Sequence, residues 1–287
     1  MNRAGTLMCI ASAAAFGTMA IFGKLLYDEG ATVGTLLATR FVLAAALLWL
    51  FVGARQLRSV SRRDAGIALA LGAIGYAAPA GGYFAALERL DASLLALLVY
   101  VFPVIVAVSA VALRRERASR RTAIALAFSV GGLLLVLAGA AGGLDPVGTL
   151  LGLATAVVYS AYVLGSEGIS TRVAPLALST LVCTGAAATL TAAGLAGGDL
   201  DPASVSASGF VWLGGLAVVS TVGAIGLFFA GLRRVGPTAA SILSTLEPVV
   251  TVALAFIAFG ESLGPAQLAG GALVLMAVLA IRTKELA

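Results

Sequence analysis

Apolar runs of about 20 residues recur along almost the whole chain, and this recurrence constrains the fold more than any other feature. A helix that crosses the hydrocarbon core of a bilayer needs about 20 mostly apolar residues. Charges and Gly/Pro clusters separate ten such runs, which predict an all-α integral membrane protein with ten transmembrane helices. The predicted spans are 5–26, 34–53, 65–87, 92–113, 122–141, 147–165, 175–195, 209–231, 237–258 and 265–282.

The composition excludes a soluble globular protein. Hydrophobic residues make up 61% of the 287 residues and charged residues only 11%, whereas an ordinary soluble domain has about 25% charged residues. So few charges cannot cover a water-facing surface, and lipid must cover it instead. The sequence has no histidine, which excludes a histidine-based metal site or catalytic triad. Cys9 and Cys183 lie far apart in apolar runs, and we interpret them as small core residues.

Basic residues gather in the segments that would lie on one side of the membrane. With the N-terminus inside, both chain ends and the connections after spans 2, 4, 6 and 8 face the cytoplasm. All 18 Lys and Arg residues except Lys24, Arg40 and Arg89 fall in those regions. The opposite connection 196–208 carries two aspartates and no basic residue. Because cytoplasmic loops are enriched in Lys and Arg, both termini are predicted to be cytoplasmic.

The chain contains an internal repeat. Segment 82–103 aligns without gaps with segment 227–248 at an offset of 145 residues. The pairs at this offset include Phe84 with Phe229, Arg89 with Arg234, Pro103 with Pro248, and Glu116 with Glu261. Several matches in one ungapped stretch indicate a duplication.

The offset divides the chain into two domains of five spans each. Residues 1–145 would form the first repeat and residues 146–287 the second. Because five is an odd number, the second repeat must enter the membrane from the opposite side. Inverted repeats are characteristic of secondary transporters, in which the two halves exchange conformations and open one site to each face in turn. The repeat therefore predicts alternating access.

Span 9 contains Glu247, the one acidic residue near the middle of a predicted span. The polar residues that share its face at helical spacing are Ser241, Ser244, Thr245 and Glu247. Pro248 removes a backbone hydrogen bond and frees the carbonyl about four residues earlier, near Ser244. A charge at this depth costs at least about 2.5–3.5 kcal/mol. Two interpretations remain open: a site for a substrate amine or a proton, and a structural carboxylate that satisfies the backbone around the proline or pairs with Arg40 or Lys24.

Five of the six tyrosines lie at mid-span depth. They are Tyr76, Tyr83, Tyr100, Tyr159 and Tyr162. A buried tyrosine hydroxyl needs a hydrogen-bond partner, so the five predict a shared, uncharged cavity suited to planar or apolar metabolites. Ordinary packing or an interfacial aromatic belt is the alternative. The candidate helix breaks near these residues are Pro79, Pro103 and Pro248.

Two basic residues within the spans are interpreted as interfacial. Arg40 lies about six residues into span 2 near the outer face, where a snorkelling or packing role is expected and substrate binding is the alternative. Lys24 ends span 1 and is expected to reach the interface.

The whole pattern resembles the drug/metabolite transporter superfamily, and most closely its EamA-type branch. The segments that carry the resemblance are Leu246-Glu247-Pro248, Phe259-Gly260-Glu261 and Thr39-Arg40-Phe41. The first repeat departs from the pattern, with Arg114-Arg115-Glu116 where a glycine often precedes the glutamate. The resemblance implies an exporter of small metabolites, often amino acids, in the bacterial inner membrane. Overall size and helix pattern are similar to those of the YddG-type aromatic amino-acid exporters.

The leading hypothesis is a secondary exporter of aromatic or neutral amino acids or related compounds. The sequence has no Gly-x-x-x-x-Gly-Lys-Ser/Thr loop, so ATP is not expected to drive transport. A nucleotide-sugar or phosphorylated-metabolite exchanger is an alternative, but only Arg40 and Lys24 are candidates for its cationic site. A non-transport membrane protein or enzyme stays open as a different class, although acid–base chemistry lacks histidine and paired core carboxylates. We predict a small-molecule substrate and a lipid environment, no cofactor, no nucleic-acid partner and no enzymatic activity, and a monomer with a dimer left open.

Overall fold

The computed structural model describes residues 3–113, 120–139, 144–170, 172–228, 230–231, 234, 243–244 and 246–282. Within these residues all regular structure is helical. The first half contains α1 (Arg3–Gly17), α2 (Met19–Asp28), α3 (Val33–Phe51), α4 (Ala54–Arg58), α5 (Arg62–Ala70), η1 (Leu71–Tyr76), α6 (Ala77–Leu87), α7 (Ala92–Val99), α8 (Phe102–Ala112) and α9 (Arg120–Gly139). The second half contains α10 (Pro146–Ser170), α11 (Pro175–Gly197), η2 (Pro202–Ser204), α12 (Ala207–Ala217), η3 (Val218–Gly223), α14 (Leu246–Phe259) and α15 (Pro265–Arg282).

Several of these helices are long and apolar enough to cross a bilayer. The six that qualify are Arg3–Asp28, Val33–Phe51, Arg62–Leu87, Pro146–Ser166, Pro175–Gly197 and Ala207–Phe228. Four shorter apolar helices are Ala92–Val106, Ala123–Gly139, Leu246–Phe259 and Pro265–Ala277. These helices overlap the predicted spans, and they confirm a multi-pass helical membrane protein. The first part of the predicted span 237–258 lies mainly outside the described residues.

Local sequence explains several helix ends. The side-chain oxygens of Thr32, Ser61 and Ser206 accept backbone N–H groups at the starts of α3, α5 and α12. Such caps satisfy donors that have no partner within the helix. Helix α11 ends at Gly198, whose positive φ of 67° suits a residue without a Cβ atom. These signals position the short connections between the spans.

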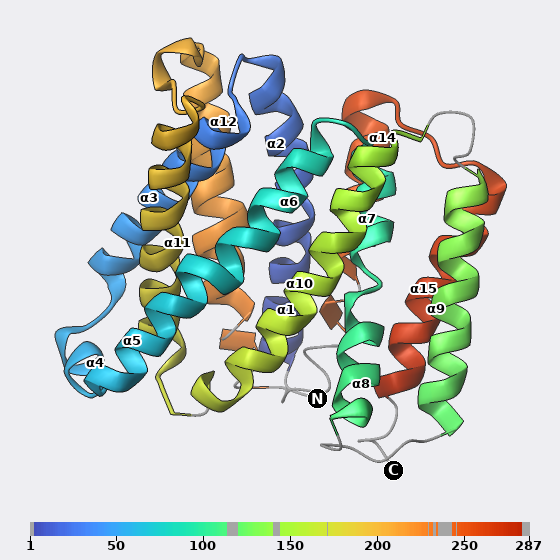
Figure 1. Ribbon diagram of the computed structural model, residues 1–287, viewed down its shortest axis with the longest axis horizontal. Coiled ribbons are helices and arrows are strands. Elements are labelled where there is room, and N and C mark those ends of the chain that lie inside the picture. The colour runs from blue at the N-terminus through green and yellow to red at the C-terminus, as the bar shows by residue number, and fades with distance from the viewer. Residues whose placement is uncertain are drawn as a thin grey trace.

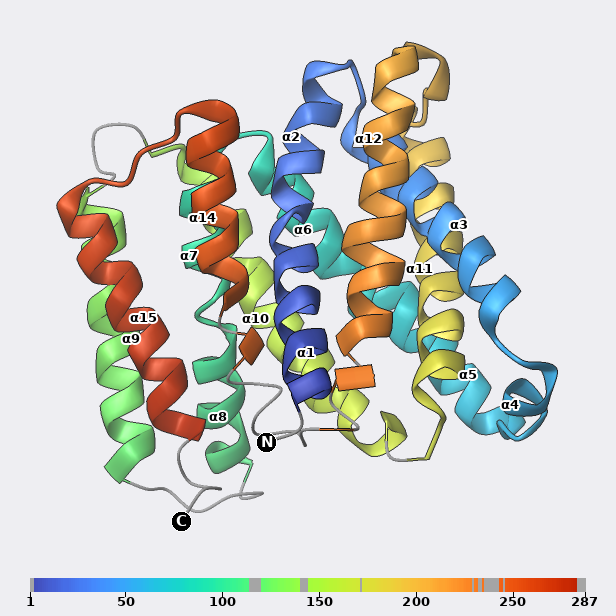
Figure 2. The same cartoon turned by 180° about the vertical axis from the view of Figure 1, so that it is seen from behind.

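The helices form an elongated bundle. Helices α9 and α15 pack together at one end, and α3 and α11 pack together at the other. Between them lie α1, α2, α6, α7, α10 and α14, with α10 packed against α6 and α1 packed against α14 (Figures 1 and 2). Each of these pairs joins residues far apart in the sequence. The centre of the bundle is therefore built by helices from both halves of the chain.

Glycines allow η1 and α5 to approach α11 closely. A Cβ atom on Gly72 would overlap the carbonyl of Val182, and one on Gly185 would overlap the carbonyl of Leu69. The contact joins η1 and α5 to α11. Membrane helices commonly use small residues in this way, because lipid supplies little hydrophobic force to press them together.

Two π-helical segments and one break between helices interrupt the spans near the centre. The π-helical segments η1 and η3 interrupt the helices Arg62–Leu87 and Ala207–Phe228. Pro79 follows η1 inside α6, so the chain remains helical through it. Pro103 lies in the first turn of α8, after a break that separates α8 from α7, and Pro248 lies in the first turn of α14. π-helical bulges and prolines both leave backbone groups free for other partners.

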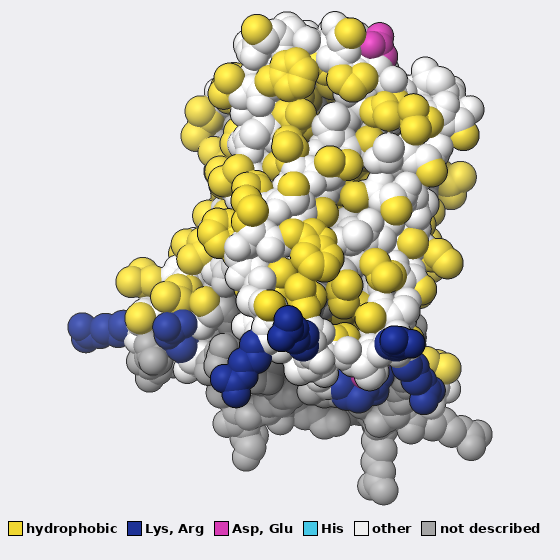
Figure 3. Space-filling model, turned by 90° about the vertical axis from the view of Figure 1, so that its left-hand side faces the viewer, with side chains coloured by type: hydrophobic (Ala, Val, Ile, Leu, Met, Phe, Trp, Pro, Cys, Tyr) yellow, Lys and Arg dark blue, Asp and Glu magenta, His cyan; other side chains and the backbone are white. Residues whose placement is uncertain are grey.

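The surface separates apolar and basic regions. In the face that Figure 3 shows, Lys and Arg side chains form a rim at the lower end, and hydrophobic side chains cover the body above it. Helix α1 begins and α15 ends at that same lower side (Figure 1). Large apolar side chains such as Leu50, Ile74 and Ile257 are almost fully exposed. An apolar surface of this extent needs lipid to cover it.

Candidate functional site

A cavity of about 150 Å³ lies where helices from both halves meet. Its lining residues are Phe16, Met19, Arg40, Tyr76, Pro79, Ala80, Tyr83, Phe84, Val99, Tyr100, Phe102, Thr155, Tyr159 and Glu247. They come from α1, α2, α3, η1, α6, α7, α8, α10 and α14. Because one water molecule needs about 10–15 Å³ measured in this way, the cavity has room for roughly ten waters.

Four of the five predicted tyrosines line the cavity, namely Tyr76, Tyr83, Tyr100 and Tyr159. The fifth, Tyr162, lies behind them: its ring centroid is 5.3 Å from that of Tyr76 and 5.9 Å from that of Tyr159. Edge-to-face contacts extend the cluster from Tyr159 through Phe102 to Tyr100. Such contacts hold aromatic rings in fixed orientations. The cluster forms a rigid aromatic wall on one side of the cavity.

The backbone carbonyl near Pro248 that the sequence predicted to be free of a helical partner is bonded by a tyrosine side chain. The hydroxyl of Tyr100 donates a hydrogen bond to the carbonyl of Ser244, at 2.7 Å. This carbonyl is four residues before the proline, which cannot donate to it. The contact ties α7 to the start of α14. Thr245 and Ser241, which were predicted to share this face, lie outside the described residues.

Arg40 is buried at the centre of the molecule, and its interpretation as a snorkelling residue is wrong. Its side chain is 2% exposed and lines the cavity. The guanidinium donates to the Thr221 hydroxyl at 3.0 Å and to the Met19 sulfur at 3.3 Å. It also lies over the rings of Phe41 and Phe84, at 5.0 and 5.4 Å from their centroids. In the part of the chain that the structure describes, no carboxylate lies within ion-pair distance of it.

Glu247 is the acidic group of the same cavity. It lies in the first turn of α14, and its backbone carbonyl accepts a hydrogen bond from Thr251. Among the described residues, no hydrogen bond or ion pair reaches its carboxylate. The predicted pairing of Glu247 with Arg40 or Lys24 is therefore not found in these residues. The prediction of an uncharged cavity is also wrong, because Arg40 and Glu247 both line it.

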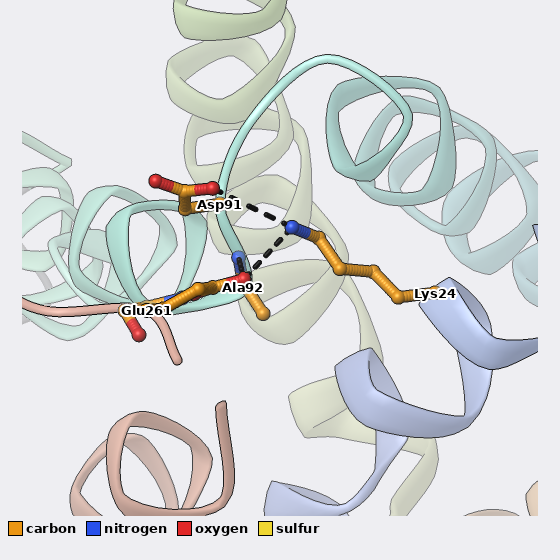
Figure 4. A network of polar contacts seen from close by, with 5 residues as sticks. Lys24, Asp91, Ala92 and Glu261 are labelled. Carbon is orange, nitrogen blue, oxygen red and sulfur yellow. Dashed lines mark hydrogen bonds and ion pairs between the residues drawn. The ribbon is translucent and has the colours of Figure 1, made fainter. Parts of the chain in front are cut away.

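A second pocket, of about 810 Å³, opens at the end of the bundle opposite the basic rim. Lys24 and Glu261 line it and form an ion pair at 2.8 Å, and Asp91 lies 3.6 Å from the same ammonium (Figure 4). Glu261 also accepts hydrogen bonds from the backbone N–H groups of Ala92 and Ser93, at 3.0 and 2.9 Å. The carboxylate thus caps the start of α7 while it binds α2.

These contacts set the ionisation of Glu261. Burial alone raises the pKa of this carboxyl, but the hydrogen bonds from Lys24, Ser93 and Ala92 and the charge of Lys24 outweigh burial. The pKa of Glu261 therefore lies below its ordinary value. Glu261 is ionised at neutral pH and joins the ends of three helices, α2, α7 and α14.

No group of three or more Cys, Asp or Glu side chains in the described part of the chain is arranged to hold a metal ion. The central cavity combines aromatic faces and hydroxyls with the side chains of Arg40 and Glu247.

Comparison with known proteins places the chain in a family. The sequence model of the EamA-like transporter family matches residues 3–138 and again residues 146–283. The chain belongs to the EamA-like transporter family. The double match also shows that it contains two copies of the EamA unit, and it identifies the molecule as a membrane transporter.

The EamA-like chain has full-length relatives. It is 29% identical over 280 residues to an uncharacterized transporter of Archaeoglobus fulgidus, covering 96% of each protein. It is 26% identical over 278 residues to the uncharacterized transporter YcbK of Bacillus subtilis, covering 93% of this chain and 89% of that protein. A crystal structure with a TM-score of 0.68 covers 100% of this chain and 98% of the other, at 21% identity. That structure shows the same fold.

Sequence reasoning missed part of this site. Phe16, Met19 and Thr155 line the cavity and stood out in no pattern. The sequence does carry a signal for Arg40, because this arginine lies well inside an otherwise apolar run. Membrane-embedded charges usually face the interior of a bundle, and that rule alone would have placed Arg40 in the cavity.

Proposed function

We propose that this EamA-like protein is a secondary transporter that exports small metabolites, with aromatic or neutral amino acids as the substrate class. One observation carries the proposal: the aromatic cavity between the two halves contains a buried cation, Arg40, and a partly buried acid, Glu247. Ligand sites are typically apolar or aromatic clefts with a few polar groups that orient the ligand. The substrate would bind here against the tyrosine wall.

Alternating access would move the substrate across the membrane. We propose ten transmembrane helices in two inverted repeats, 1–145 and 146–287, that rock about the central cavity. The two matches to the family model support the duplication. So do the two π-helical segments, η1 and η3, which interrupt the third and eighth predicted spans. The inversion follows from the odd number of spans in each predicted copy.

The proposed location is the bacterial inner membrane, with both termini in the cytoplasm. The basic rim and the two ends of the described chain lie on the same side of the molecule (Figures 1 and 3). This arrangement agrees with the enrichment of Lys and Arg in cytoplasmic loops. The larger pocket around Lys24 and Glu261 would then open to the outside.

The charges of the cavity favour amino acids over phosphorylated substrates. A nucleotide sugar or sugar phosphate carries two or more negative charges and would need several cationic partners. Among the described residues, Arg40 is the one basic residue that lines the cavity, and an ionised Glu247 would repel an anion. Lys24 is engaged in the outer pocket by Glu261. The geometry therefore supports the exchanger alternative less well.

Flux measurements in proteoliposomes test the proposal. Purified protein is reconstituted, and efflux of labelled amino acids, nucleosides, a sugar phosphate and a nucleotide sugar is compared with efflux from protein-free vesicles. We expect saturable flux of an aromatic or neutral amino acid. Saturable flux of the phosphorylated solutes alone would overturn the substrate assignment, and no flux of any solute would overturn the transport proposal.

Cysteine labelling tests the location of the site. In a background without Cys9 and Cys183, Tyr83→Cys should react with a water-soluble thiol reagent, and substrate should protect it. Ile74→Cys is the matched control, because Ile74 is 73% exposed on the apolar outer surface, where lipid would shield it. Inert Tyr83→Cys together with reactive Ile74→Cys would place the water-filled path elsewhere.

A further inference from the structure

The two charged residues of the central cavity come from opposite halves of the chain. Arg40 lies on α3 in the first repeat, and Glu247 lies on α14 in the second. Tyr76 and Tyr83 line the same cavity. One small cavity therefore has a basic side chain, an acidic side chain and aromatic rings on its walls.

Neither side chain forms an ion pair with the described protein around it. The partners of the Arg40 guanidinium are a hydroxyl, a thioether and two aromatic faces. The Glu247 carboxylate has no hydrogen-bond or ion-pair partner among the described residues. A buried charge without an opposite charge is costly, so a ligand that supplied both counter-charges would bind with a large gain.

We propose that Arg40 binds the carboxylate and Glu247 binds the ammonium group of a zwitterionic amino acid, whose side chain packs against the tyrosine wall. This inference rests on the proposed transport function and specifies its substrate recognition. A guanidinium matches a carboxylate with paired N–H donors. A zwitterion carries one negative and one positive group, so its binding would give both Arg40 and Glu247 a partner of opposite charge.

The arrangement also specifies what the site rejects. An amino-acid amide lacks the carboxylate and would leave Arg40 unpaired, while its ammonium still matches Glu247. An N-acetyl amino acid lacks the ammonium and would bring a second anion next to Glu247. A site built to pair with a polar group rejects analogues that lack this group far more strongly than a hydrophobic pocket rejects a change of size.

Competition in proteoliposomes tests the proposal without any variant. The assay measures how unlabelled L-phenylalanine, L-phenylalaninamide and N-acetyl-L-phenylalanine inhibit flux of labelled L-phenylalanine. If the panel identifies another amino acid as the substrate, its amide and its N-acetyl derivative replace these probes. We expect both analogues to inhibit roughly tenfold or more weakly than the zwitterion. Equal inhibition by all three would overturn the proposal.

Two variants test which side chain binds the carboxylate of the substrate and which binds its ammonium group. Arg40→Gln should raise the relative potency of the amide to that of the zwitterion while N-acetyl-L-phenylalanine stays weak. Glu247→Gln should relieve the rejection of the N-acetyl compound while the amide stays weak. Arg89→Gln and Glu88→Gln are matched controls from the outer pocket and should leave both ratios unchanged.

The outcomes separate this inference from the transport proposal. If Arg40→Gln weakens the inhibition of flux by all three compounds equally, Arg40 is structural and its assignment to the substrate carboxylate fails. Saturable flux of a neutral or anionic solute that no zwitterion inhibits would overturn the inference and leave transport intact. Where a variant does not fold, the wild-type comparison still decides between the outcomes.

Discussion

Replacing Glu261 with glutamine should destabilise the protein by about 2–4 kcal/mol. The carboxylate of Glu261 is 6% exposed and accepts three hydrogen bonds, from the Lys24 ammonium and the N–H groups of Ala92 and Ser93. A hydrogen bond to a charged group contributes about 1.5–3 kcal/mol, and such values are not additive within one network. Breaking a buried ion pair costs about 3–5 kcal/mol, and partial exposure of Lys24 reduces this value.

Thermal unfolding in detergent, followed by tryptophan fluorescence, measures the effect. About 2 °C per kcal/mol is expected for a chain of this size, so the midpoint should fall by roughly 4–8 °C. Asp64→Asn is the control. Asp64 pairs with Arg172 at 3.0 Å, but the Arg172 side chain is 53% exposed, and surface pairs contribute about 0–1 kcal/mol.

The same melting measurements can refute the predicted role of Glu261. If Glu261→Gln melts within 1 °C of the wild type, or no lower than Asp64→Asn, the network in Figure 4 does not hold the three helix ends together. We also expect Lys24→Met to destabilise less than Glu261→Gln, because Glu261 would keep its two backbone donors. The opposite order would show that the ion pair, and not the helix cap, dominates.

Three further predictions concern pH, close packing and orientation. Because the pKa of Glu261 is lowered in the folded protein, its contribution is complete above the ordinary carboxyl pKa of about 4.3 and is lost as pH falls through the lowered value. The melting difference between wild type and Glu261→Gln should therefore shrink below pH 4; a constant difference would contradict this. Gly132→Ala should destabilise by about 1–3 kcal/mol, because its Cβ would lie 2.6 Å from a carbonyl oxygen of α15. Gly131→Ala, which meets nothing within 4 Å, should be neutral or stabilising in the same melting assay, and equal effects would contradict the helix contact. Reporter fusions after Arg62 and Asp201 should report the cytoplasm and the outside respectively, and reversed signals would refute the orientation.

Span positions and family membership could be read from the chain, because they depend on local properties. Insertion into a bilayer is determined by the length and apolarity of one segment, and both are visible in the sequence. The offset of 145 residues likewise required no structure, and the family match at 3–138 and 146–283 shows two copies. The bond from Tyr100 to the Ser244 carbonyl was foreseeable in part, because a proline always leaves that carbonyl free.

The tertiary structure alone decided which faces of the spans meet. Helix α3 is mostly apolar, so its sequence indicated that Arg40 faces the interior of the bundle but not which distant helices surround it there. Tyr162 shares a face with Tyr159 in the sequence, but its ring packs against those of Tyr76 and Tyr159 and does not line the cavity. Lys24 and Glu261 are 237 residues apart and meet at the outer pocket. Such pairings depend on how helices distant in the sequence pack against one another, and hydropathy along the chain carries no information about that arrangement.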